Sequence, residues 1–151
     1  MVRNYFLIEG FDINAEKNSI PFLLGELDLF PIALMDNLLQ ESDAQVVISS
    51  SWRSIAPGFE WFKELFELRG AKILHQRIVG VTPQLNHLPL MKQRGEEVQQ
   101  YIKQVSFAGR YICIDDCLLP YREDQPTIET NPAIGFTLEN LQDSLELLGN
   151  H

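Results

Sequence analysis

The sequence has little of what marks several protein classes. Two cysteines in 151 residues are too few for a disulfide framework, and no apolar run is long enough to cross a membrane as a helix. Lys and Arg number 12 against 21 Asp and Glu, which gives a formal net charge of −9. Broad binding to a nucleic-acid backbone needs clustered positive charge, so the composition argues against it, while a local basic pocket stays compatible with it.

What is present is the composition of an ordinary globular protein. Hydrophobic residues make up 45% and charged residues 22% of the chain. No repeat, low-complexity segment or long linker divides it, so we expect a single domain over residues 1–151. The first apolar stretch is too short for a signal peptide, and Cys113 and Cys117 are expected to be reduced thiols, so we expect a cytoplasmic protein. Without a second pair of ligands, their CxxxC spacing favours zinc only weakly.

Short apolar runs alternate with helical patterns along the chain. Strands are expected at residues 5–8, 45–49, 71–74, 110–114 and, from a weaker pattern, 127–130. Helices are expected at residues 30–42, 59–70, 94–105 and 137–149. This alternation predicts crossover connections and an α/β fold, a three-layer sandwich around a largely parallel central sheet. Ligands of such sheets gather at the carboxyl ends of the strands, so a functional site is expected there.

Polar side chains follow two of the expected strands. The stretch "SSSWR", residues 49–53, comes directly after one strand, and Asp115 and Asp116 come after another. Arg94 lies at the expected start of a helix. Serine hydroxyls and the cation of Arg53 or Arg94 would bind phosphate oxygens, and paired aspartates suit a hard cation such as Mg²⁺. The pattern is typical of phosphoryl transfer, although it lacks an obvious nucleophile.

Each part also has a simpler interpretation. The serines would fit a turn with a capping hydroxyl, the aspartates a solvated loop or a helix cap, and Arg94 a surface position. Three such features at the same predicted edge of one sheet favour a functional site over three separate coincidences.

Five motifs carry a resemblance to a known family: "VVISSSWR", "IVGVTPQL", "QRGEEVQQYI", "YICIDD" and "TNPAIGFT". In their order and spacing, across residues 5–148, the sequence resembles the haloacid dehalogenase-like (HAD-like) superfamily. It is most similar to the HAD domains named after the "Swiss Army Knife" RNA repair proteins. The resemblance implies a Rossmannoid phosphatase fold in which Ser49, with Ser50 nearby, binds the transferred phosphoryl group. It also implies that Arg94 is the superfamily's cationic residue and that Asp115 and Asp116 belong to the metal-binding motif.

The first motif departs from the family pattern, which is Asp-x-Asp-Gly. Alignment on Gly10 places Leu7 at the nucleophile and Glu9 at the general acid/base, and residues two apart project to the same face of a strand. Leucine neither attacks phosphorus nor binds magnesium, so Mg²⁺ binding is expected to be weakened. We therefore predict a catalytically impaired or silent domain that retains a phosphate and metal pocket as a binding module.

Under two alternative interpretations of the first motif, the protein is an active Mg²⁺-dependent phosphatase. Asp12 would replace the missing nucleophile if the strand ran on past Gly10, which would bury a carboxylate and place glycine inside a strand. Otherwise Glu9 would activate water on a metal-bound phosphate. The intervals after the first two strands lack room for a large cap domain, so an open site would suit a large phosphorylated substrate such as a nucleic-acid end.

Overall fold

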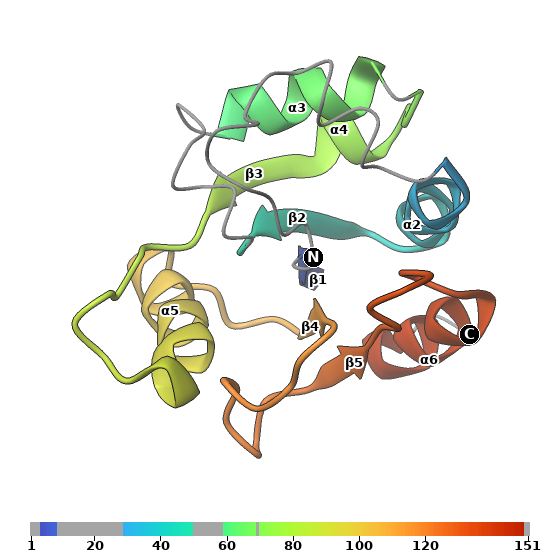
Figure 1. Cartoon of the computed structure of the whole chain (residues 1–151). Coiled ribbons are helices and arrows are strands. Elements are labelled where there is room, and N and C mark those ends of the chain that lie inside the picture. The colour runs from blue at the N-terminus through green and yellow to red at the C-terminus, as the bar shows by residue number, and fades with distance from the viewer. Residues whose placement is uncertain (1–3, 9–28, 50–58, 69, 150–151) are drawn as a thin grey trace.

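The described strands form one five-stranded parallel sheet (Figure 1). The computed structural model describes residues 4–8, 29–49, 59–68 and 70–149. The strands lie in the order β3-β2-β1-β4-β5, and each neighbouring pair is parallel. The mixed α/β class with parallel strands is thus confirmed. The bounds are β1 (Asn4–Ile8), β2 (Ala44–Ile48), β3 (Ile78–Val81), β4 (Tyr111–Asp115) and β5 (Thr127–Glu129).

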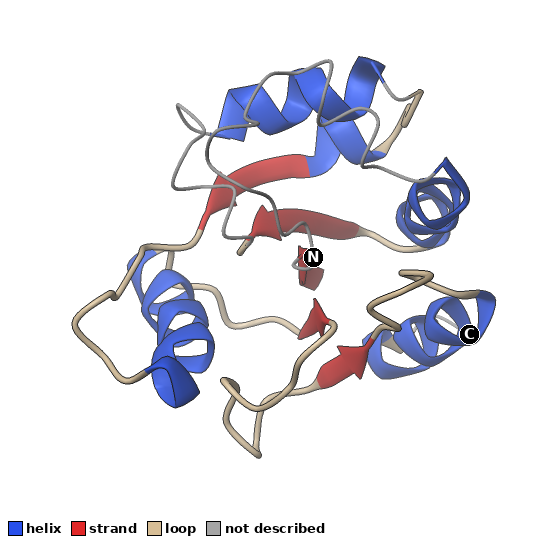
Figure 2. Cartoon of the chain, in the orientation of Figure 1, coloured by secondary structure: helices blue, strands red, loops and turns tan. Residues whose placement is uncertain are grey.

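Helices lie between successive strands from β1 to β4, as the alternating pattern predicts, whereas a loop joins β4 to β5 and the last helix follows β5 (Figure 2). The last of them shows how local sequence sets its ends. The Thr137 hydroxyl accepts from the Asn140 backbone N–H, the Asn140 side chain accepts from the Thr137 N–H, and Gly149 ends the helix at φ 78°. No helix in the described part of the chain is long and apolar enough to cross a membrane. The bounds are α2 (Leu29–Glu41), α3 (Phe59–Leu68), α4 (Leu74–Arg77), α5 (Leu90–Gln104) and α6 (Leu138–Leu148).

The two faces of the sheet are covered by different clusters of buried side chains. Successive residues of a strand point to opposite faces, and Val46 and Ile48 of β2 join one cluster while Val47 joins the other. The larger cluster includes residues of α2, α4 and α6, and we call its side the α2–α6 face. The smaller cluster, of Val47, Val98, Cys113 and Tyr121, lies against α5, and we call its side the α5 face. In Figure 1, α5 lies on the opposite side of the strands from α2 and α6.

One predicted strand is wrong. Residues 71–74 were expected to be extended, but they form a turn that leads into α4, and the strand is the next segment, β3. The backbone N–H groups of Ile73 and Leu74 both donate to Oδ1 of Asp36, at 2.8 and 2.7 Å. A carboxylate that accepts these N–H groups stabilises the start of a helix. Because Asp36 lies on α2, far away in sequence, the local pattern could not show this contact.

A second correction concerns the helix that carries Arg94. We expected this residue at the helix start, but α5 begins at Leu90, so Arg94 lies in its second turn. Pro89 occupies the N-cap position, and its fixed backbone angle suits an entry to a helix. The residues of α5 before Arg94 are mostly exposed, and its buried residues, Gly95, Glu97 and Val98, come after Arg94.

Candidate functional site

Strand β1 brings the ends of β2 and β4 to the same edge of the sheet. Ile8, its last residue, pairs with Ile48 of β2 and with Ile114 of β4. The residues that directly follow Ile48 and Ile114 in the sequence are Ser49 and Asp115. Both are buried, with Ser49 fully inaccessible and Asp115 3% exposed. The predicted phosphate-binding serine and the first predicted metal ligand therefore flank the carboxyl end of the central strand.

Arg94 reaches the same edge from α5. Its guanidinium donates a hydrogen bond to the backbone carbonyl of Ser49 and lies 3.8 Å from Oε1 of Glu97. The Thr82 hydroxyl donates to Oγ of Ser49 at 3.4 Å, and the Thr82 N–H donates to the Ile48 carbonyl at 2.9 Å. The end of β2 is thus held from α5 and from the segment that follows β3.

Asp115 is a buried carboxylate with hydrogen bonds to both of its oxygens. Oδ2 accepts from the Tyr121 hydroxyl at 2.7 Å and Oδ1 from the Cys117 N–H at 3.1 Å. Burial raises the pKa of Asp115 to about 6; the Tyr121 hydrogen bond opposes this shift, and the neighbouring Asp116 adds to it. No Lys, Arg or His in the described ranges forms an ion pair with Asp115. Within the described part of the chain, the charged form is therefore stabilised by two hydrogen bonds and by no cationic side chain.

The loop after β4 is attached to α5 through Gln125. This buried side chain donates to the Gly95 carbonyl at 3.0 Å and accepts from the Arg122 N–H at 2.8 Å, while the Gly95 N–H donates to the Pro120 carbonyl at 2.9 Å. A Cβ at Gly95 would lie 2.8 Å from the Gln125 side chain, so the close approach requires glycine. These contacts fix the loop that carries Tyr121 relative to Arg94.

The structure describes four of the predicted site residues and the backbone of a fifth position. Ser49, Arg94 and Asp115 meet at one edge as described above, and Asp116 follows in the loop after β4. The backbone of Leu7 pairs with Val47 of β2 and Cys113 of β4. These two residues come two positions before Ser49 and Asp115 in the sequence. Four further predicted residues lie outside the described residues: Glu9, Asp12, Ser50 and Arg53.

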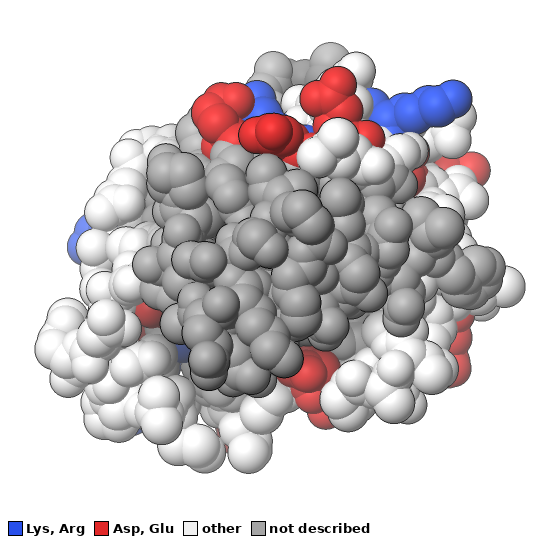
Figure 3. Space-filling view, turned by 45° about the horizontal axis from the view of Figure 1, so that its top comes forward, with Lys and Arg blue, Asp and Glu red and all other residues white. Residues whose placement is uncertain are grey.

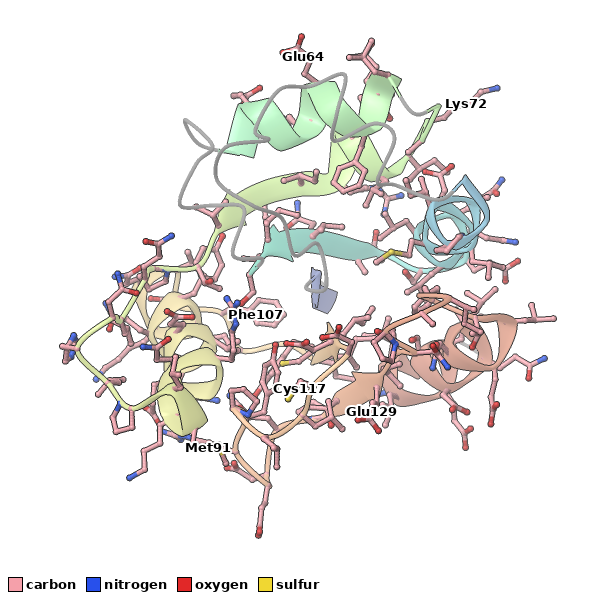
Figure 4. The ribbon with its side chains drawn as sticks, in the orientation of Figure 1. Glu64, Lys72, Met91, Phe107, Cys117 and Glu129 are labelled. Carbon is pink, nitrogen blue, oxygen red and sulfur yellow. The ribbon has the colours of Figure 1, made fainter. Side chains whose placement is uncertain are left out.

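Sequence reasoning missed three residues that contact this site. Glu97 stands three residues after Arg94, and the helical spacing that places i and i+3 side by side was a usable signal for it. Tyr121 had no such signal, because it reaches Asp115 through the turns of the loop after β4. Thr82 directly follows β3, and it was missed because that strand was expected at residues 71–74. Cys117, labelled in Figure 4, is an exposed free thiol on the loop after β4. Cys113 is buried and free.

Two carboxylates are too few to define a metal centre alone. Among the described residues, no group of three His, Cys, Asp or Glu side chains has the arrangement of a metal site. Asp115 and Asp116 supply oxygen ligands of the kind that Mg²⁺ prefers, and Mg²⁺ also retains several waters in protein sites. The pair therefore fits part of a Mg²⁺ site, with the rest to come from water, phosphate or residues beyond the described ranges.

The charge on the surface follows the acidic composition. Acidic side chains and a few basic ones gather along the top of the view in Figure 3, and the described part of that face carries no extended basic patch. A groove of about 670 Å³ runs beside α5 and includes Glu96, Gln99 and Arg122 in its lining. Two of these lining residues, Glu96 and Arg122, form an ion pair of 2.8 Å.

Comparison with known proteins identifies a family. The family described as "HAD domain in Swiss Army Knife RNA repair proteins" matches residues 11–141, which include Ser49, Arg94 and Asp115. The match begins after β1, so it does not include the departing first motif around Leu7. No curated protein and no solved structure matches the chain.

Proposed function

Since the chain belongs to the HAD domains of Swiss Army Knife RNA repair proteins, we propose that it is a phosphohydrolase-lineage domain that binds a phosphoryl group and Mg²⁺ with little or no turnover. One observation carries this proposal: Ile8 pairs with both Ile48 and Ile114, so the end of β1 lies between Ser49 and Asp115. Arg94, bonded to the Ser49 carbonyl, adds positive charge at the same place. A phosphoryl group there would meet a hydroxyl, a cation and a metal-binding carboxylate.

The buried carboxylate supports the metal part of the proposal. Burial disfavours the charged form of Asp115, which is the form that binds a metal, and no Lys, Arg or His among the described residues pairs with it. Mg²⁺, held by Asp115 and Asp116 with water, would supply the missing positive charge and draw phosphate oxygens to the site. Tyr121 would keep the Asp115 carboxylate oriented through its 2.7 Å hydrogen bond.

The first motif is the basis for proposing weak or absent turnover. The nucleophile position of the family pattern, when aligned on Gly10, is occupied by Leu7, which has no group that attacks phosphorus. Binding residues survive at the ends of β2 and β4, whereas the attacking group does not. This division is what a binding module derived from a phosphatase would retain. We propose the three-layer sandwich without a large cap as its fold.

The test combines binding with turnover. Isothermal titration of inorganic phosphate in the presence of Mg²⁺ should show binding to the wild-type protein, and Asp115→Asn should lose the Mg²⁺ dependence. A 5′- or 3′-phosphorylated oligonucleotide and a generic phosphomonoester should show no turnover above a protein-free control. Absence of phosphate binding by the wild-type protein would refute the binding module, and robust turnover would refute the silent site.

A second candidate is an active phosphatase that uses Glu9 to activate water, and the spacing in the sequence favours it. Ser49 and Asp115 come two residues after the partners of Leu7, and Glu9 comes two residues after Leu7 in the sequence. By sequence spacing alone, Glu9 is thus the first-motif carboxylate that corresponds to Ser49 and Asp115. The nucleophile would then be water, and the substrate would be a large phosphorylated molecule such as a nucleic-acid end.

Three variants separate the mechanisms. Turnover that disappears in Glu9→Gln and persists in Asp12→Asn would support water activation by Glu9. The reverse result would support Asp12 as the replacement nucleophile. If the wild-type protein shows no turnover, Leu7→Asp tests the silent site directly, because restored hydrolysis would show that only the attacking group had been lost.

A further inference from the structure

Glu97 is a carboxylate inside the α5 face. It is fully buried, on the side of α5 that faces the sheet, close to the turn that carries Arg94. Its Oε2 accepts a hydrogen bond from the Leu85 N–H at 2.8 Å, and its Oε1 lies 3.8 Å from the Arg94 guanidinium. A buried carboxylate costs free energy unless it is paired and hydrogen-bonded, and this one has both kinds of partner.

The contacts of Glu97 close a ring around the end of β2. Arg94 donates to the Ser49 carbonyl, Glu97 pairs with Arg94, and Leu85 donates to Glu97. From Leu85 the chain leads back to Thr82, whose hydroxyl donates to Oγ of Ser49. Both the carbonyl and the hydroxyl of the predicted phosphate-binding serine are therefore contacted by groups that Glu97 links together.

We propose that Glu97 is a positioning residue that holds the Arg94 guanidinium and the Thr82–Leu85 segment around Ser49, so that the hydroxyl and the cation face one phosphoryl group. This inference rests on the proposed phosphate site. Arginine has a long side chain with many rotamers, and a fixed anion beside it reduces the entropy lost when an anionic ligand binds. Glu97 would thus act on the ligand through Arg94, without touching it.

A purely structural role for Glu97 predicts something different. If Glu97 served only to accept the Leu85 N–H, Glu97→Gln would be silent, because glutamine has the same shape and retains a carbonyl acceptor. If Glu97 positions Arg94, the loss of its charge should alter Arg94 even when the fold is intact. Glu96→Gln is the matched control, since Glu96 is the adjacent residue on α5 and pairs with Arg122 instead.

The experiment uses two readouts on wild-type, Glu97→Gln and Glu96→Gln proteins with thermal unfolding as a check of the fold. The first is the Arg94 Nε–H resonance in ¹⁵N-labelled protein without ligand, assigned by its loss in Arg94→Lys. It should broaden and exchange faster with solvent in Glu97→Gln and stay unchanged in Glu96→Gln. The second is the Kd for inorganic phosphate with Mg²⁺, which should rise about tenfold in Glu97→Gln alone.

The two readouts keep the proposals distinguishable. If the wild-type protein does not bind phosphate, the proposed function fails, and the Arg94 resonance alone decides whether Glu97 positions that side chain. An Arg94 resonance that is the same in wild-type and Glu97→Gln proteins would overturn the positioning role. So would a change of equal size in Glu96→Gln.

Discussion

The two faces of the sheet contrast in what they bury. The α2–α6 face holds a large apolar cluster that includes Leu38, Leu39 and Phe66, all fully buried. The α5 face has a cluster of four buried apolar or weakly polar residues. Beside this cluster lie three polar side chains that are also buried, those of Glu97, Asp115 and Gln125. Apolar burial stabilises a fold without regard to direction, whereas buried polar groups require partners at fixed positions. The difference suggests that one face mainly stabilises the fold and the other mainly holds the candidate site.

The largest expected effect lies on the α2–α6 face. Leu38→Ala should lower the free energy of unfolding by about 2–5 kcal/mol, because it removes a fully buried side chain and leaves a cavity. Urea unfolding followed by circular dichroism measures this change. Leu119→Ala is the control: that leucine is 67% exposed, so its truncation should change stability by less than about 0.5 kcal/mol. Equal losses in the two variants would contradict the assignment of the core to this face.

On the α5 face, one substitution is expected to raise the free energy of unfolding instead of lowering it. The folded protein raises the pKa of Asp115 to about 6 from an ordinary value of 3.8, so between these values the folded state binds more protons than the unfolded state. The contribution of Asp115 to stability therefore falls as pH rises through this window. Asp115→Asn, which cannot ionise, should be more stable than wild type by about 1–3 kcal/mol at pH ~8 in the presence of a chelator.

The pH dependence of that difference is the control. At pH ~4, where Asp115 is largely protonated in the folded state, the advantage of Asp115→Asn should be much smaller. Urea unfolding of both proteins at several pH values gives the comparison. An advantage that is the same at all pH values would show that burial of the charge is not its cause.

A smaller loss is expected from Gln125→Ala. This change leaves the Gly95 carbonyl and the Arg122 N–H without their side-chain partner, which should cost about 1–2 kcal/mol of unfolding free energy. Hydrogen exchange of amides in residues 116–125 should also become faster, because the loop loses an attachment to α5. Unchanged stability and unchanged exchange would mean that the polar contacts of the α5 face do not hold that loop.

The sequence predicted the fold class and most strands because the doubly covered strands are almost entirely apolar. For β1, β2 and β4, the predicted strand ends agree with the observed ends to within one residue. Residues 71–74 also fitted it, and the strand prediction there was wrong because the contacts of Asp36 with Ile73 and Leu74 depend on tertiary structure. Apolar runs of four residues are compatible with either structure, and a distant partner decided between them.

The candidate site was predictable to the extent that it lies next to strands. Ser49 and Asp115 follow directly from the rule that ligands gather at the carboxyl ends of parallel strands. Arg94 was singled out by its place near a helix start, which is wrong by one turn, and the contact with Ser49 brings it to the site nevertheless. Tyr121 was beyond prediction, because the loop after β4 determines which atoms it contacts. Thr82 was missed because β3, the strand that it follows, was expected at residues 71–74.

One measurement tests most directly the claim that the α5 face carries the site. Backbone amide shifts of ¹⁵N-labelled protein should be recorded while inorganic phosphate and Mg²⁺ are added together. We predict saturable shifts at Ser49, Arg94 and Asp115, with little change along α2 and α6. Shifts that are absent throughout, or that gather on α2 and α6, would contradict the claim.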